Sequence, residues 1–222
     1  MIWFTSDLHL LGTSILEREE RPFEDAASCA ERIINNINIR CRPDDTLYII
    51  GDCFDYEDSV TAWTDALAYL RQIKCKTILI MGNHEYKLLA GEFNGNFGTF
   101  KEEMLSAAGF ADVLHDYTLD INGERWYLNH FPSCSMPLED VLTLFGHIHH
   151  AGGLYRYYGL NMMTDMHNFM PYNIEDLRRL RYRLVYSWRA DFELNNSKTQ
   201  ANMTSHKVEL MQGAVGKDAA SQ

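Results

Sequence analysis

Short apolar runs recur along the chain, and several of them end abruptly on polar residues. The clearest run, residues 78–81, is followed by Gly82 and then by Asn83, His84 and Glu85. A short apolar run bounded by glycine is typical of a strand buried on both faces. Ligands bind at the carboxyl ends of strands in open α/β sheets, so a site is predicted here. If residues 82–85 are considered alone, a Gly-Asn turn followed by a surface histidine explains them better than a functional site does.

The same pattern of an apolar run that ends on polar residues recurs along the chain, and this recurrence favours a functional site. Four other apolar runs meet Asp, Asn or His at their carboxyl ends, namely residues 2–5, 47–50, 125–128 and 141–145. Of the nine histidines, five lie in these turns. Neither core packing nor a random surface distribution explains this placement. The pattern therefore predicts one polar site assembled from several strand ends.

The residue types at these strand ends indicate a metal site. Aspartate, asparagine and imidazole are hard-to-borderline ligands that suit Mn, Fe, Zn or Ni, and the chain has no cluster of cysteine thiolates. The candidates are too many for one tetrahedral ion, and they suit two divalent ions about 3.5–4 Å apart that share a carboxylate.

The order of these motifs resembles that of the calcineurin-like metallophosphoesterases, especially their compact bacterial and phage members. The motifs are DxH at 7–9, GD at 51–52, GNHE at 82–85, His130, and GHxH at 146–149. Each motif is weak alone, but all five in this order are specific. The resemblance implies an α/β fold, a four-layer α/β/β/α sandwich of two mixed sheets. It also implies a dinuclear, metal-dependent hydrolase of phosphoric esters.

The resemblance further implies how the ligands are shared. One ion would be held by Asp7, His9, Asp52 and His149. The other would be held by Asp52, Asn83, His130 and His147. Asp52 would therefore bridge the two ions, and a metal-bridged hydroxide would attack phosphorus in line.

The resemblance implies roles for residues beyond the ligands as well. His84 would protonate the leaving oxygen, and Glu85 would orient His84. Arg21 would contact the substrate together with Asn83 and His84. Arg21 lies in an RPF segment similar to that of compact family members. A solvated arginine in a structural turn explains Arg21 equally well.

Periodicity predicts the elements between the motifs. Apolar positions three or four apart predict helices near residues 26–37 and 60–70, so the first strands should be parallel. Asn122 and Gly123 separate two strand-like runs and predict a hairpin, which favours an antiparallel later half. The stretch between the GNHE motif and His130 is too short for a capping domain, so an open cleft is expected.

Composition limits the class of protein. A chain of 222 residues fits one domain, and we expect a metallophosphoesterase domain over 1–190 and a polar C-terminal tail over 191–222. The five scattered cysteines suggest no disulfide framework. With no secretory signal and no run of membrane-span length, we expect a cytoplasmic protein that is not bound to a membrane. The net charge of −11 disfavours non-specific binding of nucleic acid, although two ions would make the cleft locally positive.

Within this family we expect a phosphodiesterase that acts on small or nucleotide-type phosphodiesters, with manganese as the preferred metal. The segment 53–59 contains Asp55, Glu57 and Asp58 but no Arg or Lys. It would disfavour a monoester, which is mostly a dianion at neutral pH. The alternatives are a nuclease of the same family with nucleic acid as its substrate, a phosphomonoesterase, and more remotely a non-catalytic scaffold.

Overall fold

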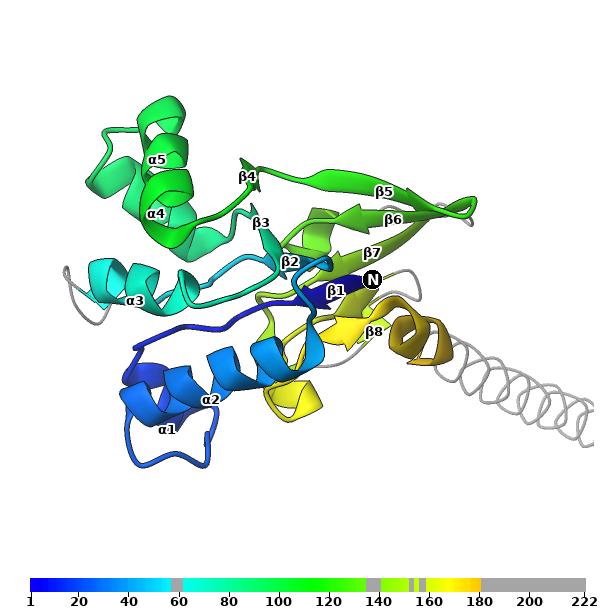
Figure 1. Cartoon of the computed structure of the whole chain (residues 1–222), viewed down its shortest axis with the longest axis horizontal. Helices are drawn as coiled ribbons and strands as arrows, with labels where there is room; N and C mark the ends of the chain where they lie inside the picture. Colours follow the sequence, from blue (N-terminus) through cyan, green and yellow to red (C-terminus); the bar gives the residue numbers. More distant parts are fainter. Residues whose placement is uncertain (57–61, 135–140, 152–153, 156–158, 181–222) are drawn as a thin grey trace, which may run out of the picture. The chain divides into compact units, whose positions relative to one another are not determined.

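Two five-stranded sheets organise the structure, a computed structural model that describes residues 1–56, 62–134, 141–151, 154–155 and 159–180 (Figure 1). Residues Met1–Leu177 form one unit, and a second unit begins at Arg178. The first sheet contains, in spatial order, β10 (Tyr172–Asn173), β1 (Ile2–Thr5), β2 (Thr46–Ile50), β3 (Lys76–Ile80) and β4 (Asp112–Leu114). The second contains β5 (Tyr117–Ile121), β6 (Glu124–Leu128), β7 (Val141–Phe145), β9 (Gly159–Asn161) and β8 (Leu154–Tyr155).

The first sheet is buried on both faces, as the apolar runs predict. Its strands β1 to β4 are parallel, and only β10 is antiparallel, at the edge. In β2, Leu47 and Ile49 belong to the core shared with the helices, whereas Tyr48 stacks on Tyr117 of the second sheet at 6.0 Å. All three of these β2 residues are less than 9% exposed. The two sheets therefore pack face to face.

Helices connect the parallel strands, as expected for right-handed crossovers. These helices are α1 (Ser14–Arg18), α2 (Ala26–Arg40), α3 (Ala62–Leu70), α4 (Asn83–Gly91) and α5 (Phe97–Glu103). The start of α2 is set by Asp25, whose carboxylate accepts a hydrogen bond from Ser28 N at 2.7 Å. Its apolar face buries Ile33 and Ile37 in the core, as the periodicity predicts.

The second sheet is mixed rather than antiparallel throughout. The predicted hairpin is present, because β5 and β6 are antiparallel around Asn122 and Gly123, both with positive φ. However, β6 pairs with β7 and β7 pairs with β9 in parallel. The connection over residues 129–140 has the length of about a dozen residues that a parallel crossover needs. The expectation of an antiparallel later half was therefore wrong, while that of two mixed sheets with helices is confirmed.

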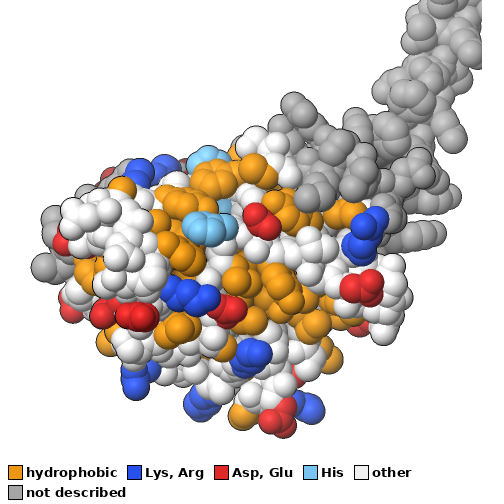
Figure 2. Space-filling model, turned by 90° about the horizontal axis from the view of Figure 1, so that it is seen from above, with side chains coloured by type: hydrophobic (Ala, Val, Ile, Leu, Met, Phe, Trp, Pro, Cys, Tyr) orange, Lys and Arg blue, Asp and Glu red, His pale blue; other side chains and the backbone are white. Residues whose placement is uncertain are grey.

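The last described element is a helical segment that starts after Asn173, whose side chain accepts a hydrogen bond from Asp176 N at 2.9 Å. The predicted domain end at residue 190 and the tail over 191–222 lie outside the described residues. Within the described part, no helix combines the length and apolar character that a membrane span needs. Seen from above, histidine side chains lie among hydrophobic ones on one face (Figure 2).

Candidate metal centre

The polar turns meet because the strands that precede them end at the same edge of each sheet. In the first sheet, Asp7 N donates to Gly51 O at 3.1 Å. In the second, Gly146 N donates to His130 O at 3.0 Å. His147 N then donates to the Asp7 carboxylate at 3.0 Å, which joins the turns of the two sheets. The predicted site residues therefore share one location although they are spread over most of the chain.

Several of these residues adopt a backbone conformation that non-glycine residues avoid. A left-handed conformation costs a non-glycine residue about 1–2 kcal/mol. Such strain concentrates at functional sites, where the surrounding structure holds it in place. The site residues with φ between 45° and 73° are Asp7, His9, Asp52, His147 and His149.

Glycines let the turns approach each other closely. A Cβ on Gly82 would lie 2.3 Å from Asp52 Oδ1, and a Cβ on Gly146 would lie 2.3 Å from Asp7 Oδ2. Real Cβ atoms essentially never come so close to another heavy atom. The glycines of the GNHE and GHxH motifs are therefore required by the carboxylates that pack on them.

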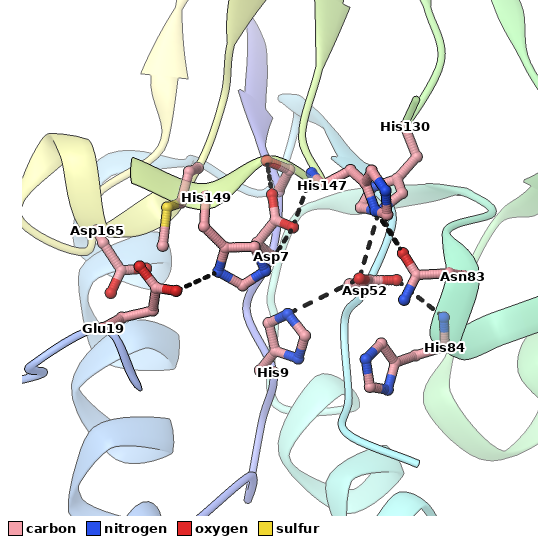
Figure 3. Close-up of polar contacts among 12 residues, drawn as sticks. Asp7, His9, Glu19, Asp52, Asn83, His84, His130, His147, His149 and Asp165 are labelled. Carbon is pink, nitrogen blue, oxygen red and sulfur yellow. Dashed lines mark hydrogen bonds and ion pairs between the residues drawn. The ribbon is translucent and has the colours of Figure 1, made fainter. Parts of the chain in front are cut away.

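One cluster consists of His130, Asn83, His147 and Asp52 itself (Figure 3). His130 Nε2 lies 3.3 Å from Asp52 Oδ2 and 3.1 Å from Asn83 Oδ1. The same Asn83 oxygen lies 2.8 Å from His147 Nδ1. His130 Nδ1 lies 2.8 Å from Ile50 O, so it donates to that carbonyl and leaves Nε2 as the coordinating atom. These four side chains could hold one divalent ion.

A second set converges on the other side of Asp52. His9 Nε2 lies 3.8 Å from Asp52 Oδ2, and His149 Nε2 lies 3.8 Å from Asp7 Oδ1. His9 Nε2 is buried and makes no hydrogen bond within the described residues. An unsatisfied buried polar atom costs about 1–3 kcal/mol, which a bound cation would remove. The donor set of Asp7, His9 and His149 therefore fits a metal ion.

Asp52 lies between the two sets. Its Oδ1 accepts a hydrogen bond from His84 N at 3.0 Å, at the start of α4. Its Oδ2 is the oxygen that faces both His9 and His130. One carboxylate oxygen is thus anchored by the helix while the other faces both clusters. This geometry suits a carboxylate shared by two ions.

The charges at the site depend on the pairing of Asp52 with His130. Burial alone would raise the pKa of Asp52, but its hydrogen bond and ion pair with His130 hold the pKa below its usual range. Burial likewise opposes protonation of His130, yet Asp52 raises the His130 pKa to about 9. Burial lowers the pKa of His147 and of His149. Without metal, His130 therefore carries a proton that a bound ion must displace.

Glu85 does not lie where it could orient His84, the role expected for it. Its carboxylate accepts hydrogen bonds from the backbone nitrogens of Gly82 at 2.7 Å, Asp52 at 2.8 Å and Cys53 at 2.9 Å. Glu85 therefore ties the GNHE turn to the GD turn. These three hydrogen bonds account for its carboxylate, so the expectation that Glu85 orients His84 is corrected.

Asp55 lies beside His84 instead. One Asp55 oxygen is 3.5 Å from His84 Nδ1, and the other is 3.5 Å from His9 Nδ1. Tyr56 N also donates to His84 Nδ1 at 3.0 Å. Asp55 is only 2% exposed, so it does not present the negative charge that was expected from segment 53–59 to disfavour a monoester. Residues 57 and 58, the other acidic positions, lie outside the described residues.

Arg21 is buried beneath the site rather than exposed to a substrate. Its guanidinium donates to the carbonyl oxygens of Asp7 and Leu8, each at 2.9 Å. It also forms a bidentate pair with Asp165 at 2.7 and 2.8 Å. Since Arg21 is 5% exposed and makes these bonds, it positions the DxH turn. This placement does not fit the expected contact with a substrate.

Glu19 is a further residue that the sequence did not single out. It follows α1, and its Oε1 lies 3.1 Å from His149 Nδ1 (Figure 3). His149 Nε2 is then the nitrogen that faces Asp7. A carboxylate behind a metal-binding histidine orients the ring and raises its basicity. No local signal separates Glu19 from the neighbouring Glu17 and Glu20.

We expect Glu19→Gln to weaken the binding of one ion by about 10- to 100-fold, since such supporting carboxylates contribute that much to affinity. The ion concerned is the one held by Asp7, His9 and His149. Competition with a chelator would measure the two affinities separately. Glu17→Gln, at an exposed position of α1, is the matched control. Equal affinities in Glu19→Gln and the unchanged protein would remove this role.

A pocket of about 230 Å³ opens beside the two clusters. Its basic lining residues, among those the structure describes, are Arg18 of α1 and Lys87 of α4. The remaining lining residues are Asp52, Asn83, His84, His147 and His149. A phosphate ester in this pocket would therefore lie against both clusters and near two cationic side chains.

Comparison with known proteins identifies the family of the chain. The chain is 23% identical over 187 residues to an uncharacterized protein of Methanocaldococcus jannaschii, covering 81% of this chain and 90% of that protein. A protein of unknown function from Aquifex aeolicus has a similar fold, with a TM-score of 0.60 and 21% identity over 81% of this chain and 98% of its own. The E. coli phosphoesterase YfcE matches with a TM-score of 0.46 and 16% identity, over 73% of this chain and 77% of its own. The sequence model of the calcineurin-like phosphoesterases matches residues 1–209, and the chain therefore belongs to that family.

Proposed function

We propose that this protein is a phosphodiesterase that uses two divalent ions, with manganese preferred, to hydrolyse small or nucleotide-type phosphodiesters. The observation that supports it is the convergence of two ligand clusters on Asp52 at the wall of a pocket. When bound, two such ions lower the pKa of a water molecule and neutralise charge that develops on the phosphoryl oxygens. Asp7, His9 and His149 would hold one ion, Asn83, His130 and His147 the other, and Asp52 both.

His84 is proposed to supply the proton for the leaving oxygen. Its Nδ1 accepts a hydrogen bond from Tyr56 N, so its proton is on Nε2. His84 also lines the pocket, so its ring would lie next to an ester bound there. The Asp55 carboxylate lies 3.5 Å from Nδ1, where it would offset the positive charge of the imidazolium that gives its proton to the leaving oxygen. A histidine placed in this way can act as a general acid.

The preference for diesters is supported by the lack of a cationic side chain that would bind a phosphate dianion in the segment after Asp52. Residues 53–56, directly after Asp52, contain no Arg or Lys. Arg21 is engaged by Asp165 and backbone carbonyls. The opposing observation is Arg18, which lines the pocket and whose side chain is 50% exposed. Arg18 favours a phosphomonoesterase as the second candidate function.

We expect bis-p-nitrophenyl phosphate to be hydrolysed with a higher kcat/KM than p-nitrophenyl phosphate. The diester carries one negative charge, whereas the monoester is mostly a dianion. Both should be measured at one pH with manganese alone. A monoester preference of about tenfold, or about 1.4 kcal/mol, that disappears in Arg18→Gln would establish the second candidate instead. The metal-dependent phosphoesterase chemistry would then still stand.

A further inference from the structure

An aromatic side chain packs directly on the candidate ligands. Phe131 follows His130 in the chain, and its ring meets the His130 ring edge-on at 5.1 Å and the His147 ring at 5.0 Å. Phe131 N donates to the Asn129 side chain at 2.9 Å, which holds the turn in place. Phe131 is nevertheless only half-buried. A partly exposed ring therefore borders the metal centre.

Phe131 is the first member of a row of rings, which we call the aromatic row and which comprises Phe131, Tyr86, His115 and Phe97. The Tyr86 ring lies 6.4 Å from that of Phe131 at 26°, and 5.8 Å from that of His115 at 11°. The His115 ring lies 4.5 Å from that of Phe97 at 28°. The Tyr86 hydroxyl also hydrogen-bonds His115 Nδ1 at 2.8 Å. Near-parallel rings from separate segments thus extend from the ligands to α5.

The aromatic row lies at the surface, although it also packs on the core. His115 is exposed, and the other three rings are half-buried. Core packing alone would be served by buried rings such as Phe100, which is 0% exposed. An exposed aromatic surface next to the candidate metal ligands indicates a binding site.

Helix α4 places the row beside the pocket. Asn83, Tyr86 and Lys87 are three and four residues apart, so they lie on one face of this helix. Asn83 and Lys87 both line the pocket, and Tyr86 belongs to the aromatic row. One helix face therefore presents a candidate metal ligand, an aromatic ring and a cation in succession. This combination suits a ligand with a phosphate next to a planar ring system.

We propose that the aromatic row is a nucleobase subsite, which binds the base on the non-leaving arm of a nucleotide-type phosphodiester. The proposal rests on the function proposed above. Every nucleobase has a π-face that can stack on aromatic side chains, whichever base it is. Arg18 and Lys87 would meet the phosphates of the same substrate in the pocket. The subsite distinguishes nucleotide esters from base-free esters of equal charge.

Two esters with the same leaving group test the nucleobase subsite. The p-nitrophenyl ester of thymidine 5′-monophosphate carries a base, and methyl p-nitrophenyl phosphate does not. We expect kcat/KM to favour the nucleotide ester by about fivefold or more, since stacking contributes that much per base. Tyr86→Leu should lower this ratio by about fivefold, and Tyr86→Phe should restore it. Tyr69→Leu, at a half-buried tyrosine of α3 outside the row, is the matched control.

A binding measurement separates this proposal from the proposed function. Titration calorimetry of the manganese-loaded protein with adenosine 5′-monophosphate and with ribose 5-phosphate isolates the base. The subsite is supported if the nucleotide binds more tightly than ribose 5-phosphate and Tyr86→Leu loses this difference, even if neither ester is hydrolysed. If Tyr86→Leu folds poorly, His115→Ala replaces it in the same measurement. Equal binding of the two compounds, or hydrolysis of both esters with equal kcat/KM, overturns the subsite and leaves the phosphodiesterase in place.

Discussion

Asp52→Ala is expected to lose both metal ions together and to lower turnover by about 10³-fold or more. Two ions contribute several kcal/mol of transition-state stabilisation, and each 1.36 kcal/mol is tenfold in rate. Asp52 Oδ2 lies 3.3 Å from His130 Nε2 and 3.8 Å from His9 Nε2. Removal of this carboxylate therefore leaves both ligand sets incomplete. Elemental analysis of the purified variant would give the number of ions per chain.

His149→Ala is the comparison for this prediction. Its Nε2 faces Asp7 on one side of the centre, so only one ion should be weakened. Circular dichroism would show that both variants are folded before their metal content is compared. Two ions per chain in Asp52→Ala would mean that Asp52 does not bridge them. Loss of both ions in His149→Ala would mean that the two sites do not fill independently.

The sequence predicts the strands and the turns that carry the ligands because both signals are local. Each apolar run forms a strand, and the polar residue after it needs no distant partner to be recognised. Parallel strands then bring their carboxyl ends together. The family's motif order adds which turn contributes which ligand. Asp7, Asn83 and His147 therefore meet in the structure although no pattern links them directly.

The residues that support the ligands were assigned less well because their partners are set by tertiary packing. Glu85 directly follows His84 in the chain and Asp55 lies far from it in sequence, yet Asp55 is the carboxylate that faces the His84 ring. Glu19 meets His149 across 130 positions of the chain. A surface-type arginine such as Arg21 is buried only because the backbone of the DxH turn offers it two carbonyls. Periodicity contains no information about such pairs.

His84→Ala is expected to keep both ions and to lose turnover in a way that depends on the leaving group. A nitrophenolate leaves readily without a proton, so its ester should lose little. A nucleoside or alkoxide leaving group needs the proton, so its ester should lose about 10²–10⁴-fold, the contribution of a general acid. The two rates should be compared in one variant with one metal. This pairing removes any general effect of the substitution on folding or metal loading.

Asp55→Asn tests the carboxylate that lies beside the His84 ring. Asp55 lies 3.5 Å from His84 Nδ1, so the variant should show the same dependence on the leaving group, with a smaller loss. Elemental analysis is needed for both variants, because His84 also lies near His9 and Asp52 in a group that could hold a metal. Loss of an ion in His84→Ala would make His84 a ligand. Equal loss of rate with both leaving groups, at full metal content, would show that His84 does not donate the proton.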